Sequence, residues 1–172
     1  RRKNIYFSVS ATTREPRPGE VDGVHYHFLD VDTFRSWIVK DEFLEYAEYV
    51  GNFYGTPKRF VDDAMNRGLD VILDIEVQGA IQVTGKRSDA VRIFIAPPSW
   101  AELERRLTER GTDSMEKIQK RLLRAKVEFQ TAHTYDYFVI NDSVENAVEE
   151  LNAIMTAEHC KPKERMEIIS GR

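Results

Sequence analysis

The order of apolar and polar positions differs between the two halves of the chain. The second half contains three short, almost continuous apolar runs, at residues 70–76, 91–98 and 137–142, with amphipathic segments between them. Such runs are typical of strands that are buried on both faces of a parallel sheet. Their alternation with segments of helical period predicts an α/β fold with a mostly parallel core sheet flanked by helices.

Capping and breaking residues set the expected boundaries of the helices. Helices are predicted over residues 57–68 and 99–111, the second of them capped by Ser99. An earlier helix is expected to be capped by Asp32 or Thr33. Two further amphipathic segments, before and after the third apolar run, complete the predicted helical layers.

The stretch from about residue 8 to residue 68 is richer in short strands and turn signals than the rest. Strands are predicted at 5–10 and 24–31, followed by a hairpin. This change of pattern predicts a separate lobe inserted into the α/β core.

The hairpin is predicted around Gly51-Asn52, between two aromatic-rich runs. With these two residues as the turn, Tyr49 lies opposite Tyr54, and Ala47 lies opposite Thr56. Alternation of side chains then puts four polar groups on one face, those of Glu45, Tyr49, Tyr54 and Thr56. The group is either a polar binding surface or an ordinary solvated sheet face, and the pattern leaves both open.

Composition narrows the class of protein. The chain has 172 residues, 41% of them hydrophobic, which is enough for one compact unit with small lobes. The net charge of −4 disfavours nucleic-acid binding, and no apolar run approaches the roughly 20 residues that span a bilayer. A single cysteine, Cys160, fits a reducing compartment. We therefore expect a cytoplasmic protein that binds neither nucleic acid nor a membrane, and the oligomeric state stays open.

Several polar side chains follow the carboxyl ends of the predicted parallel strands, where α/β proteins bind their ligands. They are Asp74, Glu76, Asn141 and Asp142. Asp74 suits an enzyme that uses a magnesium nucleotide, because Mg²⁺ is held by one or two carboxylates together with phosphates. A carboxylate that is merely exposed at a strand end is the other interpretation.

Arginines are concentrated at two places. The segment 10–26 holds Arg14 and Arg17 among hydroxyls, prolines and glycines, and its low apolar content indicates an anion site instead of a core. Arg106 and Arg110 lie four residues apart on one predicted helix face, where like charges are unfavourable unless an anion lies between them. A solvated basic face with glutamates nearby is an equally good interpretation of the second cluster.

A Walker A loop has the form Gly-x-x-x-x-Gly-Lys-Ser/Thr and surrounds phosphates with backbone N–H groups. The nearest string in the sequence runs from Gly79 to Arg87, is one residue too long, and has Arg87 in place of the hydroxyl residue. Its lysine ends a helix-like run instead of opening a helix. We interpret this string as unrelated to phosphate binding.

Seven strings occur in the order of one known family and cover the chain from about Phe7 to His159: SVSATTREPRPGEVDGVHYHF, FLEYAEYVGNFYGTP, VILDIEVQGA, FIAPPS, RRLTERGTDS, IQKRL and DYFVIND. Together they resemble the guanylate kinase family in its bacterial form. The resemblance implies a P-loop nucleoside monophosphate kinase-like α/β fold. Its mostly parallel core sheet is flanked by helices and carries an inserted mixed β/α GMP-binding lobe and a small lid.

The resemblance also implies roles for individual residues. The expected GMP-binding residues are Ser10, Arg14, Arg17, Tyr26, Glu45, Tyr54, Thr56 and Glu76. Among them the arginines and tyrosines would bind the phosphate, and Glu45 would accept hydrogen bonds from the guanine N–H groups. The expected catalytic residues are Asp74, Arg106, Arg110 and Arg121, with Mg²⁺ as the cofactor near Asp74. The expected ATP-binding residues are Arg106, Arg110, Asn141 and Asp142.

In the family, a Walker A strand, loop and helix precede the string FSVS. We therefore expect that the sequence lacks its N-terminal segment and that the 172 residues alone are inactive. The resemblance divides them into a remnant of the core, the GMP-binding lobe, the core, the lid region, and the core with the C-terminal helix and tail. The corresponding ranges are 1–7, 8–68, 69–105, 106–121 and 122–172.

The expected activity is that of a guanylate kinase in purine nucleotide metabolism, which transfers the γ-phosphoryl group of ATP to GMP and gives ADP and GDP. The alternative is a catalytically inactive guanylate-kinase-like module that binds GMP or phosphopeptides. Asp74, Arg106, Arg110 and Arg121 favour the enzyme, because a pure binding module has no use for residues that serve a donor nucleotide. A different small-molecule kinase is disfavoured mainly by Glu45 and the residues around it.

Overall fold

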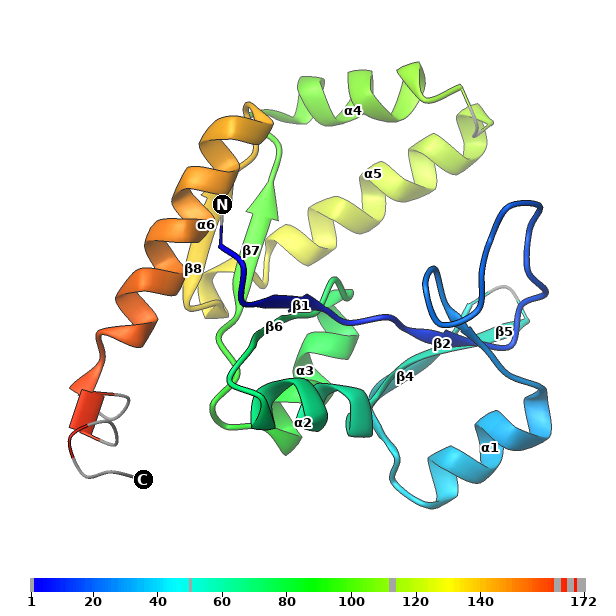
Figure 1. Ribbon diagram of the computed structural model, residues 1–172. Coiled ribbons are helices and arrows are strands. Elements are labelled where there is room, and N and C mark those ends of the chain that lie inside the picture. The colour runs from blue at the N-terminus through cyan, green and yellow to red at the C-terminus, as the bar shows by residue number, and fades with distance from the viewer. Residues whose placement is uncertain (1, 50, 112–113, 163–164, 167–168, 170–172) are drawn as a thin grey trace. The chain divides into compact units, whose positions relative to one another are not determined.

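Figure 1 shows the fold as a computed structural model, which describes residues 2–49, 51–111, 114–162, 165–166 and 169. The chain divides into two compact units, Arg1–Ala90 and Val91–Arg172. Both units combine helices with parallel strand pairs, so the predicted α/β class is confirmed. None of the helices in the described ranges is long and apolar enough to cross a membrane.

The first unit contains a four-stranded mixed sheet, which we call the lobe sheet. Its strands are β2 (Ala11–Thr12), β3 (His27–Phe28), β4 (Phe43–Tyr49) and β5 (Asn52–Pro57), in the order β3-β2-β5-β4. Strand β2 pairs in parallel with β3 and antiparallel with β5. Strands β4 and β5 form the predicted hairpin.

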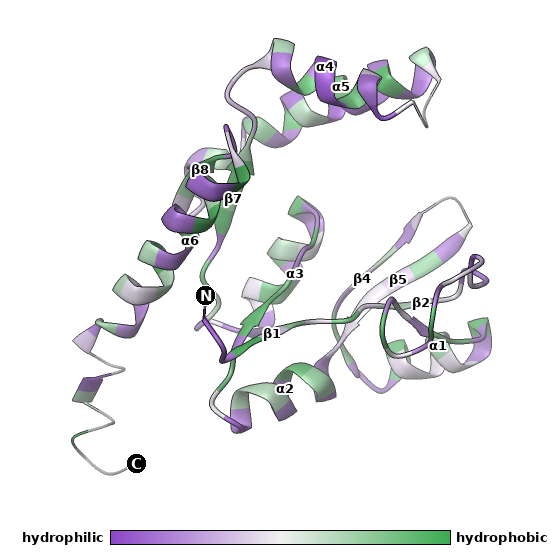
Figure 2. Ribbon diagram, turned by 45° about the horizontal axis from the view of Figure 1, so that its top comes forward, coloured by the Kyte–Doolittle hydropathy of each residue, from purple (hydrophilic) through white to green (hydrophobic). Residues whose placement is uncertain are grey.

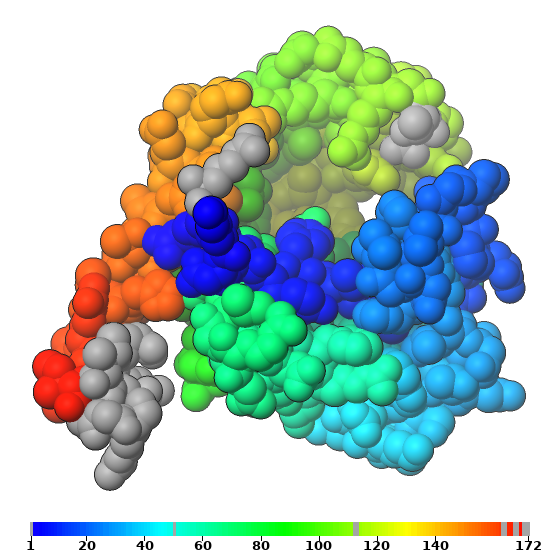
Figure 3. Space-filling model, viewed as in Figure 1, coloured from blue at the N-terminus to red at the C-terminus, as the bar shows by residue number. Residues whose placement is uncertain are grey.

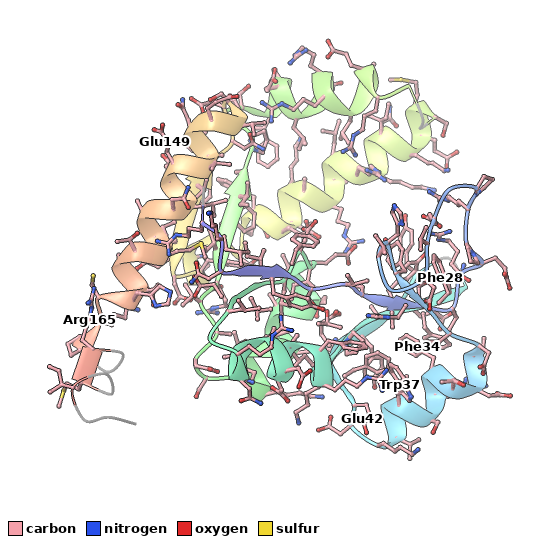
Figure 4. The ribbon with its side chains drawn as sticks, in the orientation of Figure 1. Phe28, Phe34, Trp37, Glu42, Glu149 and Arg165 are labelled. Atoms are coloured by element: carbon pink, nitrogen blue, oxygen red, sulfur yellow. The ribbon has the colours of Figure 1, made fainter. Side chains whose placement is uncertain are left out.

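One face of the lobe sheet is apolar and packs against helix α1 (Val31–Val39). Ala11, Phe34 and Phe43 are fully buried in this cluster, and Trp37 packs against them (Figure 4). The rings of Phe34 and Phe43 are stacked with their centroids 4.3 Å apart. The helical spacing of Phe34 and Trp37 therefore gives α1 the apolar stripe that fixes it to the sheet.

Two local predictions around α1 are wrong. The helix is capped by Asp30, whose carboxylate accepts hydrogen bonds from both the N–H and the hydroxyl of Thr33 at 2.7 Å. It is not capped by Asp32 or Thr33, because this earlier carboxylate already satisfies the first turn. The predicted strand 24–31 is reduced to β3, since turn hydrogen bonds such as Gly23 N–H to the Tyr26 carbonyl hold the residues before it.

The rest of the first unit is a parallel strand pair with two helices. Strands β1 (Ile5–Phe7) and β6 (Asp70–Ile72) are paired in parallel. Helices α2 (Lys58–Asn66) and α3 (Val77–Lys86) contribute Val61 and Val83 to a second buried cluster, which also contains Leu44 of β4. Strand β6 is shorter than the predicted run 70–76, because Glu76 already has the extended N-cap conformation of α3.

The second unit is built on the parallel pair of β7 (Ile93–Ala96) and β8 (Tyr137–Ile140), which are largely apolar in Figure 2. Its helices are α4 (Trp100–Glu109), α5 (Met115–Phe129), the 3₁₀ turn η1 (Ala132–Thr134) and α6 (Val144–His159). The predicted cap is confirmed, because the Ser99 hydroxyl accepts a hydrogen bond from the Glu102 N–H at 3.1 Å.

The predicted burial of the parallel strands on both faces is only half correct. Val139 and Ala96 are buried, whereas Ile95, Phe138 and Ile72 are 51%, 44% and 37% exposed. The exposure alternates along β7 and β8 because each pair is covered on one face.

Candidate functional site

The polar group predicted on the β4–β5 hairpin lies on the face of the lobe sheet that is turned away from α1. The register pairs Glu45 with Thr56 and Ala47 with Tyr54. The predicted partners are therefore wrong by two residues, because Asn52 pairs with Tyr49 and belongs to the strand. A shift of two residues leaves each side chain on its face, so the predicted grouping is confirmed.

Glu45 is a buried carboxylate with one hydroxyl partner. It is 8% exposed, and the hydroxyl of Thr56 donates a hydrogen bond to its Oε1 at 2.6 Å. Burial raises the pKa of Glu45, the hydrogen bonds from Thr56 oppose this, and the charge of Glu76 raises the pKa further. Ser10 immediately precedes β2, and continuing the β2–β5 register by one residue places it opposite Thr56. The carboxylate retains acceptor capacity for a ligand that carries N–H donors.

One face of helix α3 lies along β4 and holds this part of the strand in place. The side-chain amide of Gln82 makes two hydrogen bonds with the backbone of Tyr46. It accepts from the Tyr46 N–H at 3.2 Å and donates to the Tyr46 carbonyl at 3.0 Å. One turn away, an added Cβ on Gly79 would lie 3.1 Å from Oε2 of Glu45. Because β4 is an edge strand, Gln82 supplies the pairing that a neighbouring strand would otherwise give.

The string that mimics a Walker A loop has a structural explanation. Its lysine, Lys86, lies at the end of α3, where it donates to the Asp41 carboxylate and, at 2.7 Å, to the Phe43 carbonyl. Lys86 thus fixes the helix to the start of β4. The interpretation of this string as unrelated to phosphate binding is supported by these contacts.

The close approach of α3 to Glu45 gives a testable prediction. Gly85→Ala is expected to stabilise the protein by roughly 0.5–1 kcal/mol, because an added Cβ there meets no atom within 4 Å and alanine favours helix. Gly79→Ala is expected to destabilise it by about 1 kcal/mol, because its Cβ presses on the Glu45 carboxylate. Urea unfolding of the two variants measures both values. Equal stabilisation by both changes would contradict the close contact at Gly79.

The predicted phosphate-binding side chains meet beside β5. Nη2 of Arg14 donates to both carboxylate oxygens of Glu20 at 2.9 and 3.0 Å. The Arg14 guanidinium lies 5.5 Å from the ring centroid of Tyr26. The ring centroids of Tyr26 and Tyr54 are 6.2 Å apart, and the two rings meet edge to face. The structure therefore brings three of the four predicted side chains together.

Arg17, the fourth, lies on the exposed segment between β2 and β3, which is drawn in blue in the space-filling view (Figure 3). Its backbone N–H donates to Oε2 of Glu20 at 2.7 Å. The hydrogen bond to Glu20 and its negative charge raise the pKa of Arg14. The hydrogen bonds from the Arg14 side chain and from the Arg17 backbone lower the pKa of Glu20. Both groups are therefore ionised at neutral pH.

Asp74 and Glu76 both follow the carboxyl end of β6, as predicted, and both are exposed. Glu76 occupies the N-cap position of α3, and its charge reaches Glu45. Glu76 therefore lies near the buried carboxylate. Asp74 lies between the strand and this cap.

The second unit carries the other predicted residues. Nε of Arg106 donates to Oε1 of Glu102 at 2.7 Å, and its Nη2 donates to the Asp142 carbonyl at 3.4 Å. Arg110 is the C-cap residue of α4 and Arg121 lies on α5, and both are exposed. The structure thus brings Arg106 together with Asp142, and a glutamate balances the charge of Arg106. Arg105 and Arg106 hold the pKa of Glu102 down to about 2.

Asn141 and Asp142 occupy the turn between β8 and α6. The Asn141 N–H donates to the Ala96 carbonyl at 2.8 Å, which continues the parallel pairing by one step. The Asp142 carboxylate accepts from the Ser143 N–H and from the Asn146 amide at 2.6 and 3.0 Å, and these bonds lower its pKa. The turn is therefore rigidly defined at the carboxyl end of the strand.

No group of three or more metal-binding side chains occurs among the described residues. Mg²⁺ sites that also use phosphate oxygens need only one or two carboxylates from the protein. The exposed carboxylate of Asp74 is a suitable donor of this kind.

Three residues of the site were missed by the sequence analysis: Glu20, Gly79 and Gln82. A glycine inside a helix costs stability, so Gly79 could have indicated a close packing contact. Glu20 follows Arg14 by six residues across two prolines, and this spacing carries no pairing signal. Gln82 could not have been found, because its role depends on β4 being an edge strand.

Comparisons with known proteins agree on one family. The family model described as Guanylate kinase matches residues 1–158. A guanylate kinase of Thermus thermophilus is 57% identical over 157 residues, which cover 91% of this chain and 71% of the relative. One of Halalkalibacterium halodurans is 53% identical over 163 residues, covering 95% and 79%. The crystal structure of guanylate kinase from Anaplasma phagocytophilum is similar, with a TM-score of 0.76 at 35% identity, and covers 93% of this chain and 79% of that one.

Proposed function

Because this chain belongs to the guanylate kinase family, we propose that it transfers the γ-phosphoryl group of ATP to GMP and gives ADP and GDP. Membership of the family makes it a nucleotide kinase. Its relatives are named as enzymes, which supports the kinase instead of an inactive binding module. The reaction belongs to purine nucleotide metabolism. A single, exposed cysteine, Cys160, is consistent with the reducing cytoplasm as its location.

The guanine subsite is formed by Glu45, Thr56, Ser10 and Glu76. The free acceptor positions of the Glu45 carboxylate would take the N–H donors of guanine. Where guanine has its N1–H and N2–H donors, adenine has the N1 acceptor and a C2–H, so AMP would leave the buried carboxylate unpaired. Thr56 keeps the carboxylate oriented through its hydrogen bond at 2.6 Å. Ser10 and Glu76 would provide further polar contacts at the rim.

The phosphate subsite is formed by Arg14, Arg17, Tyr26 and Tyr54. An arginine offers N–H donors in a planar fork that matches phosphate oxygens, and the phenols add neutral donors. Tyr54 and Thr56 are two residues apart on β5 and share a face, which separates them by about 6.7 Å along the strand. One nucleotide can therefore contact both subsites.

The donor side is assigned to the second unit together with Asp74. Arg106, Arg110 and Arg121 would neutralise charge on the transferring phosphoryl group. Asn141 and Asp142, with the first two arginines, would contact ATP. Asp74 would hold Mg²⁺, which when bound neutralises charge on the phosphate oxygens. The residues of this chain bind and orient the two nucleotides, and no covalent intermediate is required.

The proposed division of labour follows the sequence. Residues 8–68 form the GMP-binding lobe, 69–105 belong to the core, and 106–121 form the lid. Residues 1–7 and 122–172 complete the core, with the C-terminal helix and tail.

The observation that carries this proposal is the buried Glu45–Thr56 pair on the same sheet face as Tyr54 and its Arg14–Tyr26 neighbours. Calorimetric titration of the chain with GMP, AMP and guanosine tests it. GMP is expected to bind at least tenfold more tightly than either of the other two. Equal binding of GMP and AMP would remove the basis for a guanine subsite.

We further predict that a polypeptide of these 172 residues binds GMP without turnover, because no Walker A motif occurs in it. A coupled assay of ADP formation, with ATP, Mg²⁺ and GMP, measures this. The control is the same polypeptide fused behind a Walker A strand, loop and helix, which is expected to gain GMP-dependent turnover. Robust turnover by the unfused polypeptide would contradict the prediction.

A further inference from the structure

Glu20 contacts both arginines of the proposed phosphate subsite: Arg14 through its side chain and Arg17 through its backbone. Its Oε1 and Oε2 accept hydrogen bonds from Nη2 of Arg14 at 2.9 and 3.0 Å, and Oε2 also accepts from the backbone N–H of Arg17 at 2.7 Å. The side chains of Arg14 and Glu20 are only 16% and 18% exposed. The contact is therefore a shielded, three-point attachment, which differs from an ordinary surface ion pair.

Between Arg14 and Glu20 the hydrogen bonds of the segment involve one or both of these two residues. After Glu20, separate hydrogen bonds to His25, Phe28 and Tyr26 hold the chain. Residues 15–19 are exposed, and the segment contains no helix and no buried apolar side chain between Thr13 and Tyr26. A backbone hydrogen bond from the Glu20 N–H to the Arg17 carbonyl at 3.0 Å closes a turn in it. The contacts of Glu20 thus fix the side chain of Arg14 and the turn at Arg17, whereas the backbone N–H of Arg14 donates to the Thr12 hydroxyl at 3.2 Å.

We propose that Glu20 is a positioning residue for the phosphate of GMP, acting through Arg14 and through the backbone at Arg17; this inference rests on the proposed function. Glu20 and the Glu15 carbonyl, which accepts from Nη1 of Arg14 at 2.7 Å, orient the guanidinium beside Tyr26 before the nucleotide arrives. These contacts use Nη1 and Nη2 and leave Nε among the remaining donors for phosphate. A preoriented arginine loses less conformational freedom on binding.

The opposite effect is also physically reasonable, because a carboxylate bound to Arg14 could compete with the phosphate. The two effects differ in sign. Positioning predicts weaker GMP binding when Glu20 is neutralised, whereas competition predicts tighter binding.

Calorimetric titration of the 172-residue chain with GMP and with guanosine tests the proposal in the Glu20→Gln variant. GMP is expected to bind about tenfold more weakly than to the wild type, while guanosine, which lacks the phosphate, binds unchanged. Unchanged guanosine binding also shows that the variant is folded. The matched control is Asp63→Asn, which removes an exposed carboxylate from α2 of the same unit and is expected to leave both affinities unchanged.

A double-mutant cycle with Arg14→Ala separates positioning from an independent effect of charge. If Glu20 acts through Arg14, Glu20→Gln has little further effect once Arg14 is absent. Additive losses, or unchanged or tighter GMP binding by Glu20→Gln, would overturn the inference. Failure of the wild type to prefer GMP over AMP would instead refute the proposed function, and the role of Glu20 would fall with it.

Discussion

An Arg14→Ala variant is expected to bind GMP roughly 100-fold more weakly than the wild-type chain and to bind guanosine with unchanged affinity. Charge-assisted hydrogen bonds from a guanidinium to a phosphate are among the strongest polar contacts in proteins, and a loss of about 2.7 kcal/mol corresponds to this factor. Arg14 is the cation of the proposed phosphate subsite that contacts Tyr26 and is oriented by its hydrogen bonds to Glu20. Paired titrations with GMP and guanosine measure the effect directly.

Two further variants control for trivial causes. Arg67→Ala removes an exposed arginine at the end of α2 in the same unit and is expected to leave GMP affinity unchanged. Arg14→Lys keeps the charge but loses the planar fork, so an intermediate loss is expected. If Arg14→Ala weakened guanosine as strongly as GMP, the residue would support the fold of the lobe and not the phosphate.

The hairpin shows which part of the site could be predicted from the sequence. The aromatic-rich runs around Gly51 and the alternation of polar side chains placed Glu45, Tyr54 and Thr56 on one face, and the structure confirms this. The exact cross-strand partners were wrong, because a turn signal such as Gly51-Asn52 does not fix whether Asn52 belongs to the turn or to the strand. Only an odd shift would have moved the side chains to the other face, so the functional conclusion survives.

Contacts between distant segments could not be predicted in the same way. The attachment of Gln82 to Tyr46 depends on which strand ends the sheet, and that is a property of the topology. The pairing of Arg14 with Glu20 depends on the path of a segment without regular structure. The Ser99 cap was predicted correctly, because capping involves residues within one turn. The same reasoning placed the cap of α1 at Asp32 or Thr33 instead of Asp30, because several capping residues lie close together there.

A Glu45→Gln variant is expected to lose most of the discrimination between GMP and AMP. The ionised carboxylate can accept both N–H donors of guanine, whereas the amide of glutamine offers one acceptor and one donor, and that donor can serve the N1 acceptor of adenine. Loss of a charged acceptor costs about 2 kcal/mol, so GMP is expected to bind roughly 30-fold more weakly while AMP binding improves. Titration with both nucleotides gives the ratio. Equal losses for GMP and AMP would mean that Glu45 does not contact the base.

Glu45→Gln is also expected to change how the stability of the protein and its affinity for GMP depend on pH. Burial raises the pKa of Glu45 above 4.5, so its contribution to stability is fully present below pH 4.5 and is lost as the pH rises through the raised value. Glu45→Gln has no charge to bury and can still accept the Thr56 hydrogen bond, so it is expected to unfold at a higher temperature than the wild type at neutral pH.

The GMP affinity of the wild type is expected to rise with pH over the range in which the stabilising contribution of Glu45 falls. Affinity for GMP should rise as the pH passes through the raised pKa of Glu45, because only the ionised form accepts two hydrogen bonds from guanine. Affinity of Glu45→Gln should lack this dependence. Thermal unfolding and GMP titrations of both proteins between pH 4 and pH 8 test the pair of trends. If the variant were less stable than the wild type at neutral pH, the ionised carboxylate of Glu45 would stabilise the fold. Burial of this charge in the absence of a ligand would then not lower the stability of the protein, contrary to the prediction.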